Sequence, residues 1–169
     1  MGKKKRFLRD LARGGKAEEL VSDLLNESGL PSFVDKETRL EWDVQAQYGE
    51  DNFTVEVKFD AYEAKSGNIA IEVYNPRLGK PSGITATQAF FWAHVLVDKV
   101  VWMTTVKKLK QYLDKHRPSR IIDAGGDNNA TLWLYPGDEI LPGAFVRVDT
   151  MTPHDFLNFV VQRLEKDDD

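Results

Sequence analysis

Residues 42–60 read WDVQAQYGEDNFTVEVKFD and contain two short runs of alternating polarity on either side of the turn-rich segment YGEDN. In the second run, apolar residues occupy every other position from Phe53 to Phe59, with Thr54, Glu56 and Lys58 between them. Successive side chains of a strand point to opposite faces of the sheet. The pattern therefore predicts an antiparallel hairpin with one apolar face and one polar face.

The polar face of this hairpin carries a candidate metal site. If the register places both polar faces on the same side, Asp43 lies near Glu56 and Lys58, whereas a one-residue slip moves Asp43 to the other face. Two neighbouring carboxylates suit Mg²⁺ or Mn²⁺, which lowers the pKa of a bound water, and a nearby ammonium can orient that water. The alternative is an ordinary Glu–Lys cross-strand pair on an exposed sheet.

Length and composition limit the possible classes of protein. The chain has 169 residues, of which 41% are hydrophobic, enough for one globular domain with a proper core. It has no cysteine, which excludes a disulfide framework, a zinc-thiolate site and a thiol nucleophile. No apolar run approaches the roughly 20 residues of a membrane span, and no apolar segment follows the basic N-terminus as in a secretory signal. We expect a cytoplasmic protein without a membrane partner.

Charge is unevenly distributed along the chain. The net charge is -4, but the first 16 residues contain seven basic residues and one acidic residue, so they carry +6 and the remainder carries -10. Residues 1–15 are interpreted as a basic arm and residues 165–169 as a frayed acidic tail. A basic arm suits contacts with DNA phosphates, and the alternative is a solubilising terminus. The candidate DNA-binding residues here are Lys3, Lys4, Lys5, Arg6, Arg9, Arg13 and Lys16.

A helix is predicted over residues 16–27, because apolar residues recur there at helical spacing and Gly29 and Pro31 follow as stop signals. Glu18 and Glu19 lie in its first turn. They are either partners of the helix dipole or, for one of them, a further acid at the metal patch. Glu18 is the better candidate because it borders the apolar stripe.

The middle of the chain supplies further candidates. Residues 68–74 are predicted to form a strand, in which Glu72 is either an additional carboxylate near the metal or a solvated residue. Residues 75–83 form a loop whose Arg77 and Lys80 are candidate phosphate contacts. Residues 85–97 are predicted to form a helix, with Gln88 as a candidate contact to the metal site or scissile phosphate and His94 as a core or surface histidine.

The remaining elements complete an α/β pattern. They are predicted to be a strand at 99–104, a basic helix at 106–116, strands at 120–124, 131–135 and 144–149, and a helix at 153–164. No repeat or linker divides the chain, so residues 16–164 are expected to form one α/β domain with a mixed central β-sheet flanked by helices.

The order of a helix with Glu18, then Asp43, then Glu56-x-Lys58, then a strand, a helix and a strand resembles the PD-(D/E)XK nuclease superfamily. This superfamily includes restriction endonucleases, Holliday-junction resolvases and related repair nucleases, and the resemblance covers residues 14–105. Trp42 stands where the family's proline would precede Asp43. Residues 80–95, KPSGITATQAFFWAHV, are also similar to phage-encoded members.

The resemblance implies a restriction-endonuclease-like core and a set of residue roles. Asp43 and Glu56 would hold the divalent metal, Lys58 would position the water, and Glu18 would be the acid carried by the helix. Glu19, Glu72 and Gln88 are further candidates around that centre. The hypothesis is a Mg²⁺- or Mn²⁺-dependent deoxyribonuclease, a resolvase- or restriction-like endonuclease.

Two other classes of function remain open. One is a nucleic-acid-binding module with an inactive nuclease fold, and the other is an interaction protein whose acidic body contacts a partner. A homodimer is one option for the enzyme, because many nucleases cut two strands symmetrically. The DNA substrate is not specified by the sequence.

Overall fold

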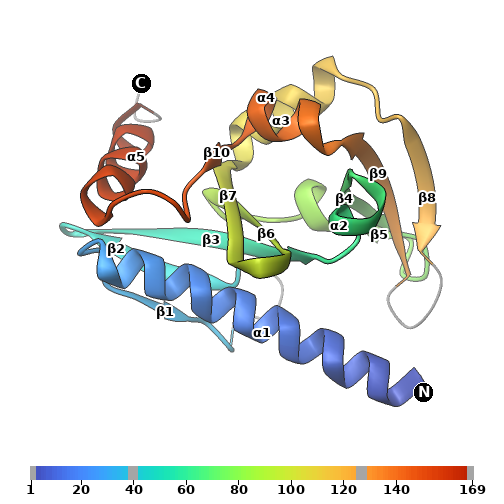
Figure 1. Ribbon diagram of the computed structural model, residues 1–169, viewed down its shortest axis with the longest axis horizontal. Helices are drawn as coiled ribbons and strands as arrows, with labels where there is room; N and C mark the ends of the chain where they lie inside the picture. Colours follow the sequence, from blue (N-terminus) through green and yellow to red (C-terminus); the bar gives the residue numbers. More distant parts are fainter. Residues whose placement is uncertain (1–2, 38–41, 125–128, 167–169) are drawn as a thin grey trace.

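The computed structural model describes residues 3–37, 42–124 and 129–166, with side chains from residue 13 onward. Its strands form two sheets (Figure 1). Sheet A has the order β1 (Ser32–Val34), β2 (Val44–Tyr48), β3 (Asp51–Asp60), β6 (Phe91–Leu96), β7 (Val100–Thr105) and β10 (Val146–Arg147). Sheet B has the order β5 (Lys80–Pro81), β4 (Asn68–Asn75), β9 (Ala130–Pro136) and β8 (Arg120–Ala124).

Sheet A is mixed: β3 pairs in parallel with β6, and all other neighbouring strands of the sheet pair antiparallel. Sheet B is antiparallel throughout. The helices are α1 (Lys3–Glu27), α2 (Glu63–Ser66), α3 (Val106–Lys115), α4 (Gly137–Ala144) and α5 (Pro153–Lys166), with short 3₁₀ turns η1 (Gly83–Thr85) and η2 (Val97–Lys99). The expected α/β class with a mixed central sheet and flanking helices is confirmed.

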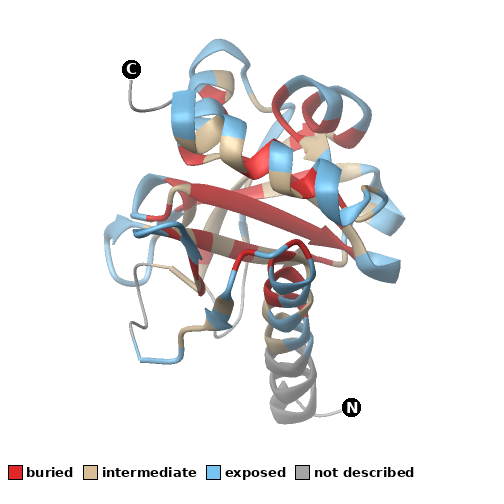
Figure 2. Cartoon of the chain, turned by 90° about the vertical axis from the view of Figure 1, so that its left-hand side faces the viewer, coloured by how far each residue is buried: buried red, intermediate tan, exposed pale blue. Residues whose placement is uncertain are grey.

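Two hydrophobic cores lie on opposite faces of sheet A. The first packs the apolar stripes of α1 and α5 against one face, with Val21, Val55 and Val160 fully buried. The second fills the space between the other face, sheet B, α3 and α4, and contains Ile71 and Trp92. Figure 2 shows the buried strands running through the middle of the molecule between its helices.

The predicted hairpin is confirmed in its register. Val44 faces Val55 across β2 and β3, and Ala46 faces Phe53, so the apolar residues of both strands enter the first core. The polar residues consequently share the opposite face. The turn at Gly49 has a positive φ of 62°, which glycine adopts without steric strain.

The predicted helix at 85–97 is wrong. Residues 91–96 form the strand β6, all six of its residues are buried, and β6 lies between β3 and β7. A strand covered on both faces has no polar alternation, so its sequence resembles that of a buried helix. His94 therefore lies in a central strand, where its Nε2 donates to Asp60 Oδ2 at 3.0 Å and its Nδ1 accepts from the Trp92 indole at 3.4 Å.

Two other boundaries differ from the prediction. Helix α1 begins at Lys3 rather than Lys16, and Gly14 and Gly15 lie inside it. Helix α4, over 137–144, replaces the start of the predicted strand at 144–149, of which only β10 remains. Pro142 and two glycines in α4 are signals of a loop, and they obscured this helix.

The other predicted elements are confirmed to within a few residues. They are β4, β7, α3, β8, β9 and α5. Thr105 caps α3 by accepting a hydrogen bond from the Lys108 N–H at 3.1 Å. Within residues 3–37, 42–124 and 129–166, no helix is both long and apolar enough to cross a membrane.

Candidate active site

Sheet A opens beside β3 at Asp43. The Asp43 N–H donates to the Val55 carbonyl at 3.0 Å, and the Asp43 carboxylate then accepts from the Val57 N–H at 2.8 Å. A side chain thus takes the place of the next backbone partner, and the pairing of β2 with β3 stops there without leaving the Val57 N–H unpaired. The remaining half of β3, through Asp60, has no β2 partner, so β2 does not cover this edge of the strand.

Glu56 and Lys58 lie on that polar face, two residues apart on β3. The Lys58 Nζ is 3.3 Å from Glu56 Oε1, and the two side chains are 35% and 13% exposed. The Thr87 hydroxyl donates to the other Glu56 oxygen at 3.3 Å. Glu56 is therefore fixed from two sides, by an ammonium on its own strand and by a hydroxyl from the segment between η1 and β6.

The carboxylates around Lys58 are held in unfavourable surroundings for a negative charge. Burial raises the pKa of Asp43, although the Val57 N–H and Lys58 oppose it. Burial also raises the pKa of Glu56, with Lys58 lowering it and Asp43 raising it further. Burial is the largest cause for both carboxylates, and the attraction of Lys58 offsets it only in part.

Glu18 of α1 belongs to the same electrostatic cluster. Burial raises the pKa of Glu18 from 4.5 to about 7, and the charges of Asp43 and Glu56 add to the increase. Lys36 and Lys58 act in the opposite direction. A carboxylate on a helix and two on a hairpin are thus close enough to repel one another.

Lys58 experiences the opposite balance. Burial lowers the pKa of its ammonium, but the carboxylates of Glu56, Glu72 and Asp43 outweigh that effect and raise the pKa above its ordinary value. Lys58 therefore remains charged at neutral pH. Glu72, half-buried on β4, is near enough to act on Lys58, so a strand of sheet B contributes to the cluster.

The other predicted residues lie away from this cluster or at its margin. Glu19 and Gln88 are exposed. Arg77 lies in the turn between β4 and β5 and Lys80 in β5, both exposed. Arg13 and Lys16 are exposed on α1. The side chains of Lys3, Lys4, Lys5, Arg6 and Arg9 lie outside the described residues, as do residues 167–169 of the acidic tail.

Two residues of the cluster were not identified from the sequence. Thr87 contacts Glu56, and Lys36 acts on Glu18. Neither belongs to a motif, and each comes from a connecting segment whose path is set by tertiary packing. The TATQ segment offered no signal once residues 85–97 were interpreted as a helix.

The donor chemistry of the cluster fits a hard divalent cation. Asp43, Glu56 and Glu18 supply carboxylate oxygens, the ligands that Mg²⁺ and Mn²⁺ prefer, and burial raises the pKa of each, so a bound cation would favour their ionised forms. Within the described ranges, no group of three or more His, Cys, Asp or Glu side chains is arranged to hold a metal ion as it lies. Binding would therefore require side chains to rearrange from the Glu56–Lys58 pair.

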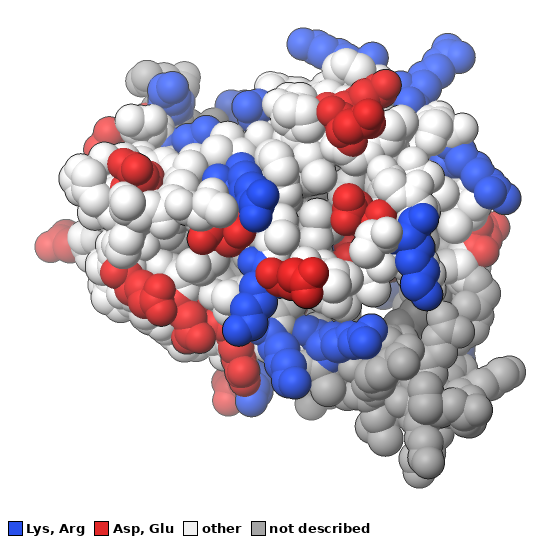
Figure 3. Space-filling view, viewed as in Figure 1, with Lys and Arg blue, Asp and Glu red and all other residues white. Residues whose placement is uncertain are grey.

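The face of the molecule drawn in Figure 3 carries both signs of charge. In Figure 3, acidic side chains in the middle of the face have Lys and Arg side chains between and around them. The described surface on this face therefore presents mixed charge rather than a uniformly acidic body.

A comparison with solved structures finds a nuclease of the same fold. The bacterial homing endonuclease I-Ssp6803I aligns over 92% of this chain and 95% of its own, with a TM-score of 0.53 and 11% sequence identity. At that identity the similarity concerns the fold alone. No family model matches the sequence, and no curated protein matches it.

Proposed function

We propose that this protein is a metal-dependent DNA nuclease that hydrolyses phosphodiester bonds, a resolvase- or restriction-like endonuclease. The observation that carries the proposal is that Glu56 and Lys58 lie on the polar face of β3 while the Asp43 carboxylate, just before β2, is hydrogen-bonded to Val57 between them. The fold shared with a bacterial homing endonuclease supports it.

Asp43 and Glu56 would hold the divalent cation, Mg²⁺ or Mn²⁺, through their carboxylate oxygens. When bound, such a cation lowers the pKa of a coordinated water and offsets negative charge on the phosphorane. The donor set contains only oxygen ligands, which favours these ions over zinc.

The chain's own residues would perform the remaining tasks. Lys58 keeps its charge at neutral pH and would orient the attacking water and stabilise charge on the phosphate oxygens. The water oxygen forms a bond to phosphorus and the bond to the 3′ oxygen breaks, leaving a 5′-phosphate and a 3′-hydroxyl. Glu18, with a pKa of about 7, can hold or release a proton near neutral pH.

The test is cleavage of a panel of linear, flapped and four-way-branched DNAs with Mg²⁺ or Mn²⁺. The Lys58→Ala variant is expected to lose activity by about 100-fold or more, the scale of one electrostatic group in an active site. The Lys65→Ala variant removes an exposed lysine from α2 and should cleave like the wild type. Equal cleavage by Lys58→Ala and wild type would remove Lys58 from the mechanism.

A second candidate is a nucleic-acid-binding module with an inactive nuclease fold. It is favoured by the Glu56–Lys58 ion pair and by the lack, in the described part of the chain, of acidic side chains already arranged around a metal position. This candidate predicts salt-dependent DNA binding without turnover and no thermal stabilisation by Mn²⁺. The cleavage panel and a melting curve with Mn²⁺ separate the two.

A homodimer is the assembly we propose for the nuclease, since two copies would place one cleavage centre on each strand of a duplex. The molar mass in solution, with and without DNA, tests it. If the protein cleaves duplex DNA while the measured molar mass corresponds to a single chain on the DNA, the homodimer is contradicted.

A further inference from the structure

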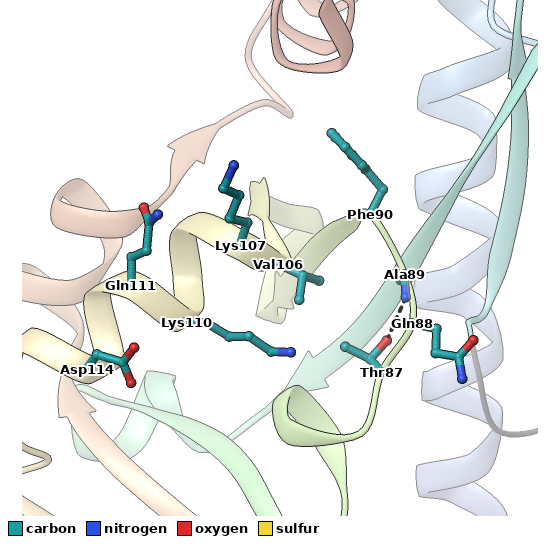
Figure 4. A pocket seen from close by; sticks show the side chains of 9 residues that line it. All are labelled: Thr87, Gln88, Ala89, Phe90, Val106, Lys107, Lys110, Gln111 and Asp114. Carbon is teal, nitrogen blue, oxygen red and sulfur yellow. Dashed lines mark hydrogen bonds between the residues drawn. The ribbon is translucent and has the colours of Figure 1, made fainter. Parts of the chain in front are cut away.

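A pocket of about 440 Å³ lies between α3 and the segment that leads into β6. One wall is the first half of α3, including Lys107, Lys110 and Gln111, and the opposite wall is the segment 87–90 (Figure 4). The pocket contains none of the four residues Glu18, Asp43, Glu56 and Lys58.

The pocket nevertheless adjoins the candidate active site through Thr87. The Thr87 hydroxyl donates to Glu56 Oε2 at 3.3 Å and accepts from the Ala89 N–H at 3.2 Å. Thr87 thus belongs both to the wall of the pocket and to the carboxylate cluster. The pocket and the carboxylate cluster are therefore neighbours on either side of Thr87.

The polar groups that line the pocket suit a phosphate and its sugar. Lys107 and Lys110 supply two ammonium groups against the one carboxylate of Asp114, and Gln88 and Gln111 supply neutral amides. Lys110 points across the pocket toward the Thr87 segment, while Asp114 lies farther along α3 (Figure 4). The first turn of α3 forms part of the wall, and the positive end of its dipole also favours an anion.

We propose that this pocket seats the DNA backbone beside the scissile bond, with Lys110 as its principal phosphate contact and Lys107 as a second. The proposal rests on the proposed nuclease function and assigns a path to its substrate: from the Asp43–Glu56 centre, past Thr87, and along the first half of α3. This path differs from the phosphate contacts expected from the sequence, since Arg77 and Lys80 do not line the pocket.

The experiment measures binding separately from cleavage. A fluorescently labelled duplex is titrated in EDTA, so that no divalent metal supports turnover, and anisotropy is recorded at several salt concentrations. Lys110→Ala is expected to weaken binding about fivefold and to reduce the salt slope by about one, the effect of losing one phosphate contact. Lys107→Ala/Lys110→Ala should reduce the slope by about two.

Lys108→Ala is the matched control. Lys108 is exposed on the same helix, carries the same charge and lies outside the pocket. Relative to the wild type, the changes in affinity and salt slope caused by Lys108→Ala should be smaller than those caused by Lys110→Ala by a factor of about two or more. Melting temperatures of all variants verify that the fold is retained.

Each outcome decides the proposal. Equal losses for Lys110→Ala and Lys108→Ala would overturn the pocket, even if the wild type cleaves DNA. A selective loss for Lys110→Ala supports the pocket, and if the wild type then fails to cleave with Mg²⁺ or Mn²⁺, only the nuclease function is rejected. A wild type that does not bind duplex DNA would overturn the pocket, and the cleavage panel then decides the nuclease function separately.

Discussion

The Val57 N–H donates to the Asp43 carboxylate at 2.8 Å, at the point where β2 stops pairing with β3. The same carboxylate both completes the edge of the sheet and acts on Glu56 and Lys58 through its charge. Sheet formation and the proposed chemistry therefore depend on one side chain, and a substitution at Asp43 must be chosen to separate them.

Asp43→Asn is expected to keep the fold and lose activity. The amide oxygen of the substituted side chain can still accept from Val57, whereas a neutral amide is a much weaker metal ligand than a carboxylate. Cleavage should fall by about 100-fold or more, with the melting temperature nearly unchanged. Asp51→Asn, on the exposed start of β3, is the control. Full activity of Asp43→Asn would exclude this carboxylate as a ligand.

Glu18→Gln is expected to stabilise the metal-free protein at neutral and alkaline pH. The folded-state pKa of Glu18 is raised from 4.5 to about 7, so the folded protein holds its proton more tightly than the unfolded chain. Stability is therefore lost as pH rises through this interval. The full shift corresponds to roughly 3 kcal/mol, and solvent screening of this half-exposed side chain reduces it to about 1–2 kcal/mol.

Urea unfolding of both proteins between about pH 4 and pH 9 measures this difference. It should be near zero at the acidic end and maximal above the folded-state pKa of about 7. The neighbouring Glu19→Gln, at an exposed position, is the control and should show no such increase. A constant difference across the pH range would contradict the assignment.

Asp60→Asn is expected to destabilise the protein by about 2–4 kcal/mol. Asp60 accepts four hydrogen bonds, from the N–H groups of Tyr62, Glu63 and Ala70 and from His94. Asparagine has one acceptor oxygen, so its NH₂ group would face donors on one side.

The pH dependence gives this prediction a direction. Burial raises the pKa of Asp60, but the His94 hydrogen bond and the backbone donors outweigh it and lower the pKa below the ordinary 3.8. The stability contributed by the ionised carboxylate is present above pH 3.8 and is lost as pH falls through the folded-state pKa. The difference in unfolding free energy between wild type and Asp60→Asn should shrink below about pH 4. An unchanged difference down to about pH 2 would refute this account.

Gly83→Ala is expected to destabilise the η1 turn and disturb the active site. Gly83 has a positive φ of 56°, and an added Cβ would clash with the backbone of Glu72. Because η1 precedes Thr87, the substitution should move the hydroxyl that contacts Glu56. We expect a loss of about 2–4 kcal/mol, measured by urea unfolding, together with reduced cleavage. Gly67→Ala, also at positive φ but with no atom within 4 Å of the added Cβ, is the control and should show the smaller loss.

The hairpin and the polar residues Asp43, Glu56 and Lys58 could be predicted because the pattern that specifies them lies within one short stretch of sequence. Alternation on both sides of a turn specifies which face each residue occupies, and the register of Val44 with Val55 follows from burying the apolar face. The place of Glu18 was predicted from its position at the edge of an apolar stripe, which a helical period reveals directly.

The strand β6 could not be predicted in the same way. Its two faces are both buried, one against each hydrophobic core. The sequence FWAHVL therefore carries no periodic alternation of apolar and polar residues. The contact between Thr87 and Glu56 joins residues 31 positions apart and depends on the parallel pairing of β3 with β6. The wrong helix at 85–97 therefore concealed both the centre of sheet A and a wall of the pocket.

Helix α1 runs without interruption from Lys3 through the glycine pair to Glu27, a length of about 37 Å at about 1.5 Å per residue. Its two ends are mechanically connected: the inner turns pack against the hairpin and carry Glu18, while the outer turns extend beyond sheet A (Figure 1). A ligand that tilted the outer turns would therefore also change the orientation of Glu18. Gly14 and Gly15, which have the lowest helix propensity of the residues in this helix, lie between its outer turns and Glu18.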